Sequence, residues 1–202
     1  MAQIPKGLEY VKSISFFLKI GAFIVLLIAL VTLGLFLNKA DISLIVSGQL
    51  TVDSFDYWER KGGLDFGMFA IVVSWLVVMI MVAFFITGLH EKITIINWPL
   101  TVAINMIIWG VLLFISGCII ADTARKYDDK TYFTTSITFC DMLKTKYPYN
   151  YYSTSDARCG HLVGASITCF ITTIIFGVDA FFNIQLFRGK ETPSAAPPAV
   201  PT

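Results

Sequence analysis

Residues 99–121 read PLTVAINMIIWGVLLFISGCIIA, a run without a single Asp, Glu, Lys or Arg. A helix of about 20 apolar residues crosses a hydrocarbon core of roughly 30 Å. A surface helix of a soluble protein would instead carry charged residues on one side, because only its other side is buried. The run therefore predicts a helix that spans a membrane.

Three further runs have the same character. Residues 67–89 carry no charge, while residues 13–37 contain only Lys19 and residues 161–186 contain only Asp179. Each is long enough to cross the bilayer, and a helix satisfies its own backbone polar groups inside lipid. The first run is also too long to be the apolar core of a cleaved signal peptide. The sequence therefore predicts an all-α fold, an integral membrane antiparallel four-helix bundle with helices at about 13–37, 67–89, 99–121 and 161–186.

The composition of the 202-residue chain agrees with this interpretation. It is 56% hydrophobic and 14% charged, whereas an ordinary soluble domain is about a quarter charged. The formal net charge is +1, and the sequence has no clustered basic face, so we expect no nucleic-acid partner. Residues 191–202 are rich in proline and poor in apolar bulk, which predicts a disordered cytoplasmic tail after a membrane domain at residues 1–190.

Four crossings place both termini on one side of the membrane and the two longer connections on the other. The count of Lys and Arg does not decide the orientation, because the longer connections hold nine and the side of the termini holds six. Cys140 and Cys159 fall in one polar connection, where a disulfide would need an oxidising compartment. We therefore predict a Cys140–Cys159 disulfide in a luminal or extracellular loop and cytoplasmic termini, with free thiols as the alternative.

Asp179 is the most costly residue of the four runs. A carboxylate near the centre of a membrane helix costs roughly 2.5 to 3.5 kcal/mol, so it should face the bundle and find a partner. Lys19 lies about 9 Å from the same membrane face and Asp179 about 12 Å, at 1.5 Å per residue. A Lys19–Asp179 pair, a hydrogen bond from Asn105 or Ser74 to Asp179, and an ion or proton site at Asp179 are the three alternatives.

Small residues in the runs favour close helix packing. Gly110 and Gly117 share one side of the third predicted helix, and Gly164 lies in the fourth. Such residues let helix backbones approach each other in lipid. The pattern fits packing within the chain and also contact between copies.

The sequence contains none of the motifs of hydrolytic or phosphate chemistry. A zinc-binding His-Glu-x-x-His, a Gly-x-Ser-x-Gly elbow, a phosphate loop and a paired-carboxylate site are all missing from it. We therefore expect a protein that is not an enzyme, with no cofactor and no metal site.

Three patches of the chain are similar to one known family. Residues 4–12 read IPKGLEYVK, residues 107–118 read IIWGVLLFISGC, and residues 176–181 read FGVDAF. These resemble, in order, the entry into the first helix, the third helix, and the acidic residue late in the fourth helix of the MARVEL-domain family. This family of four-helix membrane proteins includes MAL, plasmolipin, the chemokine-like-factor proteins and the synaptophysin group.

The resemblance implies a noncatalytic role in organising membranes: vesicle trafficking, membrane apposition or the organisation of cell junctions. It implies partners among membrane lipids, including cholesterol-rich ones, among other membrane proteins, and among further copies of the chain. It also implies a multi-pass protein of the plasma membrane or of vesicle membranes. The alternative function is a transporter or channel accessory subunit that uses Asp179 within the membrane.

Overall fold

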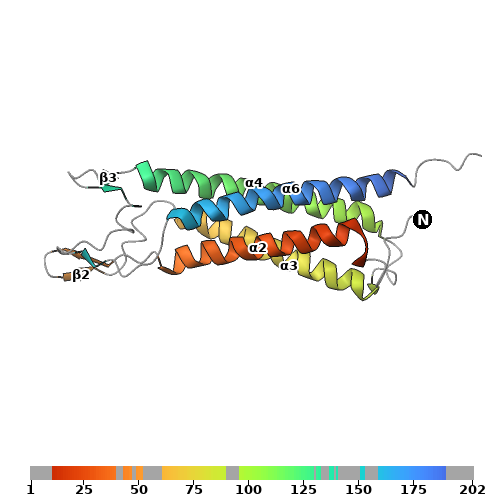
Figure 1. Ribbon diagram of the computed structural model, residues 1–202, viewed down its shortest axis with the longest axis horizontal. Coiled ribbons are helices and arrows are strands. Elements are labelled where there is room, and N and C mark those ends of the chain that lie inside the picture. The colour runs from red at the N-terminus through yellow and green to blue at the C-terminus, as the bar shows by residue number, and fades with distance from the viewer. Residues whose placement is uncertain are drawn as a thin grey trace, which may run out of the picture.

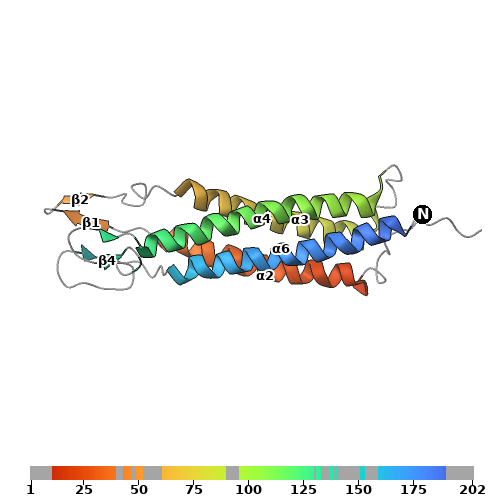
Figure 2. The ribbon, with the colours of Figure 1, turned by 90° about the horizontal axis from the view of Figure 1, so that it is seen from above.

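The computed structural model describes residues 11–39, 43–46, 49–51, 61–89, 96–129, 131–132, 137–138, 140, 151–152 and 159–189. Its body consists of four long helices that run antiparallel side by side (Figures 1 and 2). They are α2 (Ile14–Lys39), α3 (Lys61–Ile86), α4 (Trp98–Asp129) and α6 (Cys159–Arg188). All four are long and apolar enough to cross a membrane. The predicted class, an all-α membrane four-helix bundle, is confirmed.

The helices form a ring in which α2 contacts α3, α3 contacts α4, α4 contacts α6, and α6 contacts α2. The contact between α4 and α6 is the most extensive, and that between α2 and α6 is second. Helices α3 and α6 therefore lie at opposite corners of the bundle. Because α2 and α6 lie far apart in the sequence, their contacts close the ring of the described helices.

The residues that face the interior recur at alternating steps of three and four. On α2 they are Lys19, Ala22, Leu26, Ala29, Leu33 and Phe36, and on α6 they include Leu162, Ala165, Cys169, Thr172, Phe176, Asp179 and Asn183. This spacing is the heptad repeat of helices that pack side chains into the gaps of their neighbours. The other positions are also apolar because they face lipid, so hydrophobicity alone hides the repeat.

Two helices extend further than the apolar runs predicted. Helix α3 begins at Lys61 rather than near Gly67, and Leu64 in its added turn is fully buried. Helix α4 continues from Ala121 to Asp129, where Tyr127 is buried and stacks on Phe36 with ring centroids 6.5 Å apart. The apolar runs mark the hydrocarbon core, whereas the helices continue past it because packing and hydrogen bonds still stabilise them.

Exposed ion pairs one helical turn apart support the extension of α4. Lys126 Nζ lies 3.1 Å from Asp122 Oδ2, and Arg125 Nε lies 3.4 Å from Asp129 Oδ2. Pairs at this spacing stabilise a helix by a few tenths of a kcal/mol each. At the other membrane face, α3 ends at a turn in which Gly88 has a φ of 68°, the left-handed conformation common after a helix.

Short strands, which were not predicted, lie at the end of the bundle opposite the start of α2 and the end of α6 (Figure 1). They are β1 (Ser43–Val46), β2 (Gln49–Thr51), β3 (Thr131–Tyr132), β4 (Ile137–Thr138) and β5 (Tyr151–Tyr152). The sheet order is β2-β1-β5, and β3 pairs with β4, all antiparallel. Because β1 and β5 belong to different connections, their pairing joins these two connections. The predicted tail at residues 191–202 lies outside the described residues.

Candidate functional site

Lys19 and Asp179 form an ion pair inside the bundle. Lys19 Nζ lies 2.6 Å from Asp179 Oδ2, and the two side chains are 2% and 1% exposed. Lys19 comes from α2 and Asp179 from α6, and both occupy inward positions of the heptad repeat. Isolated buried charges would be costly in this setting, and the pairing compensates each with the other.

Ser15 and Asn183 complete a closed polar cluster around this pair. The Ser15 hydroxyl donates to Asp179 Oδ1 at 2.6 Å and accepts a hydrogen bond from Lys19 Nζ at 2.8 Å. The Asn183 amide donates to Asp179 Oδ1 at 3.2 Å and to the Asp179 backbone carbonyl at 2.7 Å. Both carboxylate oxygens therefore accept hydrogen bonds from side chains of the chain itself, and the cluster has no net charge.

Of the alternatives raised by the sequence, the structure contains the Lys19–Asp179 pair. Asn105 does not reach Asp179: its amide nitrogen lies 3.9 Å from the sulfur of Met81. The Ser74 hydroxyl is buried without a hydrogen-bond partner in the described part of the chain. Ser15 and Asn183 were not predicted from the sequence, although each lies four residues from a charged member of the cluster, a spacing that places both side chains on one side of a helix.

The seam between α4 and α6 is built on glycine carbonyls. Ser166 donates to the Gly117 carbonyl at 3.0 Å. The Thr173 hydroxyl donates to the Cys169 carbonyl of its own helix at 2.9 Å and also lies 3.3 Å from the Gly110 carbonyl of α4. A Cβ at Gly117 would lie 3.2 Å from Phe170 and 3.3 Å from Cys169, and one at Gly110 would lie 3.6 Å from Phe176. The two contacts are one heptad apart on both antiparallel helices, so both agree with a single register of α4 against α6.

Gly164 lies on the other side of α6. A Cβ at this position would meet Thr32 of α2 at 3.9 Å, an ordinary packing distance. Gly110 and Gly117 thus adjoin the contact of α6 with α4, whereas Gly164 adjoins its contact with α2.

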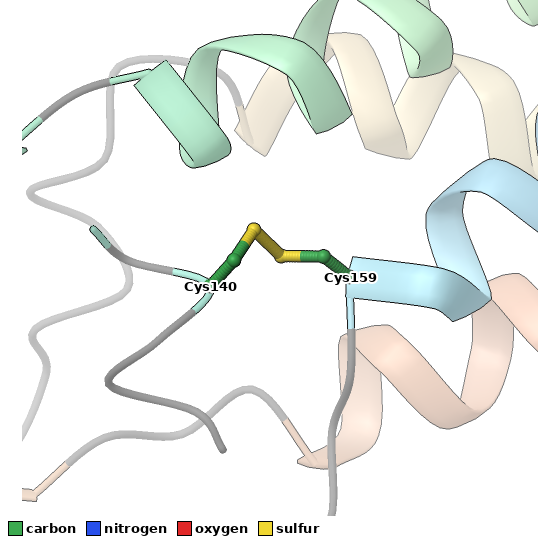
Figure 3. The surroundings of a disulfide bond; sticks show 2 residues. All are labelled: Cys140 and Cys159. Carbon is green, nitrogen blue, oxygen red and sulfur yellow. A yellow bond between two sulfur atoms is a disulfide. The ribbon is translucent and has the colours of Figure 1, made fainter. Parts of the chain in front are cut away.

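The predicted disulfide between Cys140 and Cys159 is present (Figure 3). Cys159 is the first residue of α6, and Cys140 follows β4 in the second long connection. The two Cα atoms are 5.7 Å apart, and Cys140 is 1% exposed. The bond therefore attaches this connection to the end of α6 that lies furthest from Asp179. The remaining cysteines, Cys118 and Cys169, are free.

Among the residues that the structure describes, no group of three His, Cys, Asp or Glu side chains is close enough to hold a metal ion. The arrangement at Asp179 links two helices and has no free carboxylate oxygen to offer a ligand. Its chemistry, as described, is that of a cross-link within the bundle.

Comparison with known proteins identifies the family. The family model described as MARVEL, a membrane-associating domain, matches residues 10–182. No curated protein and no solved structure gave a significant match. The matched segment includes all of α2, α3 and α4 and most of α6, with Lys19, Asp179 and the disulfide. The chain therefore belongs to the MARVEL family of membrane-associating domain proteins.

Proposed function

We propose that this protein is a noncatalytic membrane organiser that acts in vesicle trafficking, membrane apposition or the organisation of cell junctions. It works through lateral contacts with lipids, cholesterol-rich ones included, with other membrane proteins and with further copies of itself. The observation that carries the proposal is the division of the bundle: the charges of its membrane interior, Lys19 and Asp179, are paired between its own helices, while large apolar side chains face outward. Ile174 is 66% exposed and Phe17 is 65% exposed.

The alternative function is a transporter or channel accessory subunit that uses Asp179. A buried charge pair within a membrane favours this candidate, because such residues often mark ion or proton paths. The neighbours of Asp179 favour the organiser instead. One turn further into the bundle, the inward position of α6 holds the buried ring of Phe176, and Thr172 beyond it donates its hydroxyl to the carbonyl of Thr168 on the same helix.

Flux measurement separates these two functions. The purified chain is reconstituted into vesicles, and proton and cation flux are compared for the unaltered chain, Asp179→Asn and the control Thr168→Val, which loses a hydroxyl bonded within its own helix. The organiser predicts that all three equal protein-free vesicles, and that other membrane proteins co-purify with the chain from cells in a fixed ratio. A flux that Asp179→Asn abolishes and Thr168→Val preserves would establish the alternative.

The proposed orientation has both termini in the cytoplasm, in the plasma membrane or a vesicle membrane. Its support is the Cys140–Cys159 disulfide, which forms in an oxidising compartment and lies at the end of the bundle away from the start of α2 (Figure 1). A tag after Thr202 should be labelled only after the plasma membrane is permeabilised. Labelling of that tag on intact cells would reverse the orientation.

A further inference from the structure

Asn105 is a polar side chain of α4 whose hydrogen-bonding capacity is not met within the described bundle. It lies seven residues past Trp98, where α4 begins, and therefore about 10 Å into the helix at 1.5 Å per residue. Its side chain is half-buried. The described partner of its amide nitrogen is the thioether sulfur of Met81 at 3.9 Å, and sulfur is a weak acceptor.

Several other polar side chains at membrane depth are satisfied within the chain. The hydroxyls of Thr32, Ser116 and Thr168 donate to carbonyls of their own helices. A carboxamide offers two donors and one acceptor, and lipid cannot supply partners for them. The exposed part of Asn105 therefore favours a polar group from another membrane helix.

The lipid-facing side of α4 around Asn105 has the spacing of a helix-pairing seam. Thr101, Asn105, Ile108, Leu112 and Ile115 follow one another at steps of four and three residues. Thr101 is exposed, Leu112 is half-buried, and Ile108 and Ile115 are 53% and 42% exposed. These positions form a second heptad seam on α4, and the interior of this bundle does not fill it. A single Asn within such a seam sets the register of the paired helices.

We propose that this α4 seam is an interface for a second copy of the chain, with Asn105 of one copy bonded to Asn105 of the other. A twofold axis along the membrane normal keeps every residue at the same depth in both copies. A carboxamide is self-complementary because it both donates and accepts, so each Asn105 meets a suitable partner at its own depth. Any other helix would need a polar side chain at that depth. The inference rests on the proposed lateral role and names one partner for it.

Energy transfer between two labelled populations of the full chain in vesicles tests the interface. Asn105→Val should weaken self-association by about threefold to thirtyfold, the range of one hydrogen bond between membrane helices. Asn105→Gln, which keeps the amide, should associate more nearly like the unaltered chain. The control Thr168→Val should associate as strongly as the unaltered chain. Association that is unchanged in Asn105→Val, or a chain that stays monomeric, would overturn the inference.

Cross-linking tests the same interface without disturbing Asn105. Ile107 and Ile108 are neighbours of similar exposure, 46% and 53%, but only Ile108 belongs to the seam. With Cys118→Ala as the background, Ile108→Cys should give oxidised dimers in native membranes and Ile107→Cys should not. Equal cross-linking of both would overturn the seam. If copies do not associate while other membrane proteins still co-purify in a fixed ratio, the interface fails and the proposed function stands.

Discussion

Helices α6 and α3 occupy opposite corners of the bundle and are held by different chemistry. Helix α6 is bonded to α2 through Asp179 and to α4 through Ser166. Apart from the weak contact of the Asn105 amide with the Met81 sulfur, the described contacts of α3 are apolar and aromatic: Trp75 stacks on Phe23 at 5.3 Å and Phe84 contacts Trp98 at 4.9 Å between centroids. Apolar contacts tolerate small shifts, whereas short polar bonds fix a register. Helix α6 is therefore the element that defines the geometry of the bundle.

Removal of the Asp179 carboxylate should lower the stability of the bundle most, because it removes the charged contact that holds α6 to α2. Asp179→Ala leaves Lys19 buried without its counter-charge, which we expect to lower the free energy of unfolding by about 3 to 5 kcal/mol. Titration with SDS in mixed micelles measures this value. The control is Asp65→Ala, which removes an exposed carboxylate from α3. An equal, small loss in both variants would show that Asp179 does not hold α6 in place.

Loss of the disulfide should have the second largest effect, at the N-terminal end of α6. The double change Cys140→Ser with Cys159→Ser opens a loop of about 20 residues, which corresponds to about 3 kcal/mol in the chain-entropy model. The same titration without reductant measures the loss, and Cys118→Ser, at an exposed free cysteine, is the control. With reductant present, the unaltered chain should approach the double variant. No response to reductant would contradict this role.

Crowding of the seam between α4 and α6 should cause an intermediate loss of stability. Gly117→Val places a branched side chain where Phe170 and Cys169 already lie within 3.3 Å of an added Cβ. Overpacking of this kind typically costs about 1 to 3 kcal/mol. Gly177→Val on the same helix pair is the matched control, because nothing lies within 4 Å of a Cβ there. Equal stability of the two variants would mean that α4 and α6 are not closely packed at Gly117.

Removal of a single hydroxyl should change the free energy of unfolding least, and the change should have opposite signs on α6 and α3. Ser166→Ala removes a hydrogen bond from α6 to α4, so we expect a loss of about 0.6 kcal/mol, the average for such bonds in a membrane. Ser74→Ala on α3 removes a buried hydroxyl without a described partner, so stability should stay level or rise by up to about 1 kcal/mol. Paired titrations measure both. A larger loss in Ser74→Ala than in Ser166→Ala would reverse the comparison.

The sequence predicted the features that lipid imposes. Apolar runs of more than 20 residues with at most one charge have few alternatives to a spanning helix, so the helix count and the fold class followed from them. The family followed from three short patches that resemble it. Cys140 and Cys159 were identifiable because they share a polar connection. The start of α3 and the end of α4 were not, since Leu64 is fixed by burial in the core of the bundle and Tyr127 by stacking on Phe36 of α2, rather than by local hydrophobicity.

The polar cluster around Asp179 was predicted only in part, because its geometry also depends on tertiary contacts. The depths of Lys19 and Asp179 made their pairing one of three alternatives, but depth does not specify direction around a helix. Asn105 lies at a comparable depth and points to Met81 instead. Lys19 and Asp179 occupy inward positions of the heptad repeat, and Asn105 does not. Hydropathy does not reveal these inward positions, because lipid-facing positions are as apolar as buried ones. Ser15 and Asn183 were missed because a serine and an asparagine near helix ends are common.

A double-mutant cycle at Lys19 and Asp179 tests most directly whether this pair is the cross-link that joins α2 and α6. The free energy of unfolding in SDS titrations is compared for Lys19→Met, Asp179→Leu and the double variant. Because each single change strands one buried charge and the double change strands none, the double variant should be more stable than either single variant. Losses that simply add in the double variant would contradict the account.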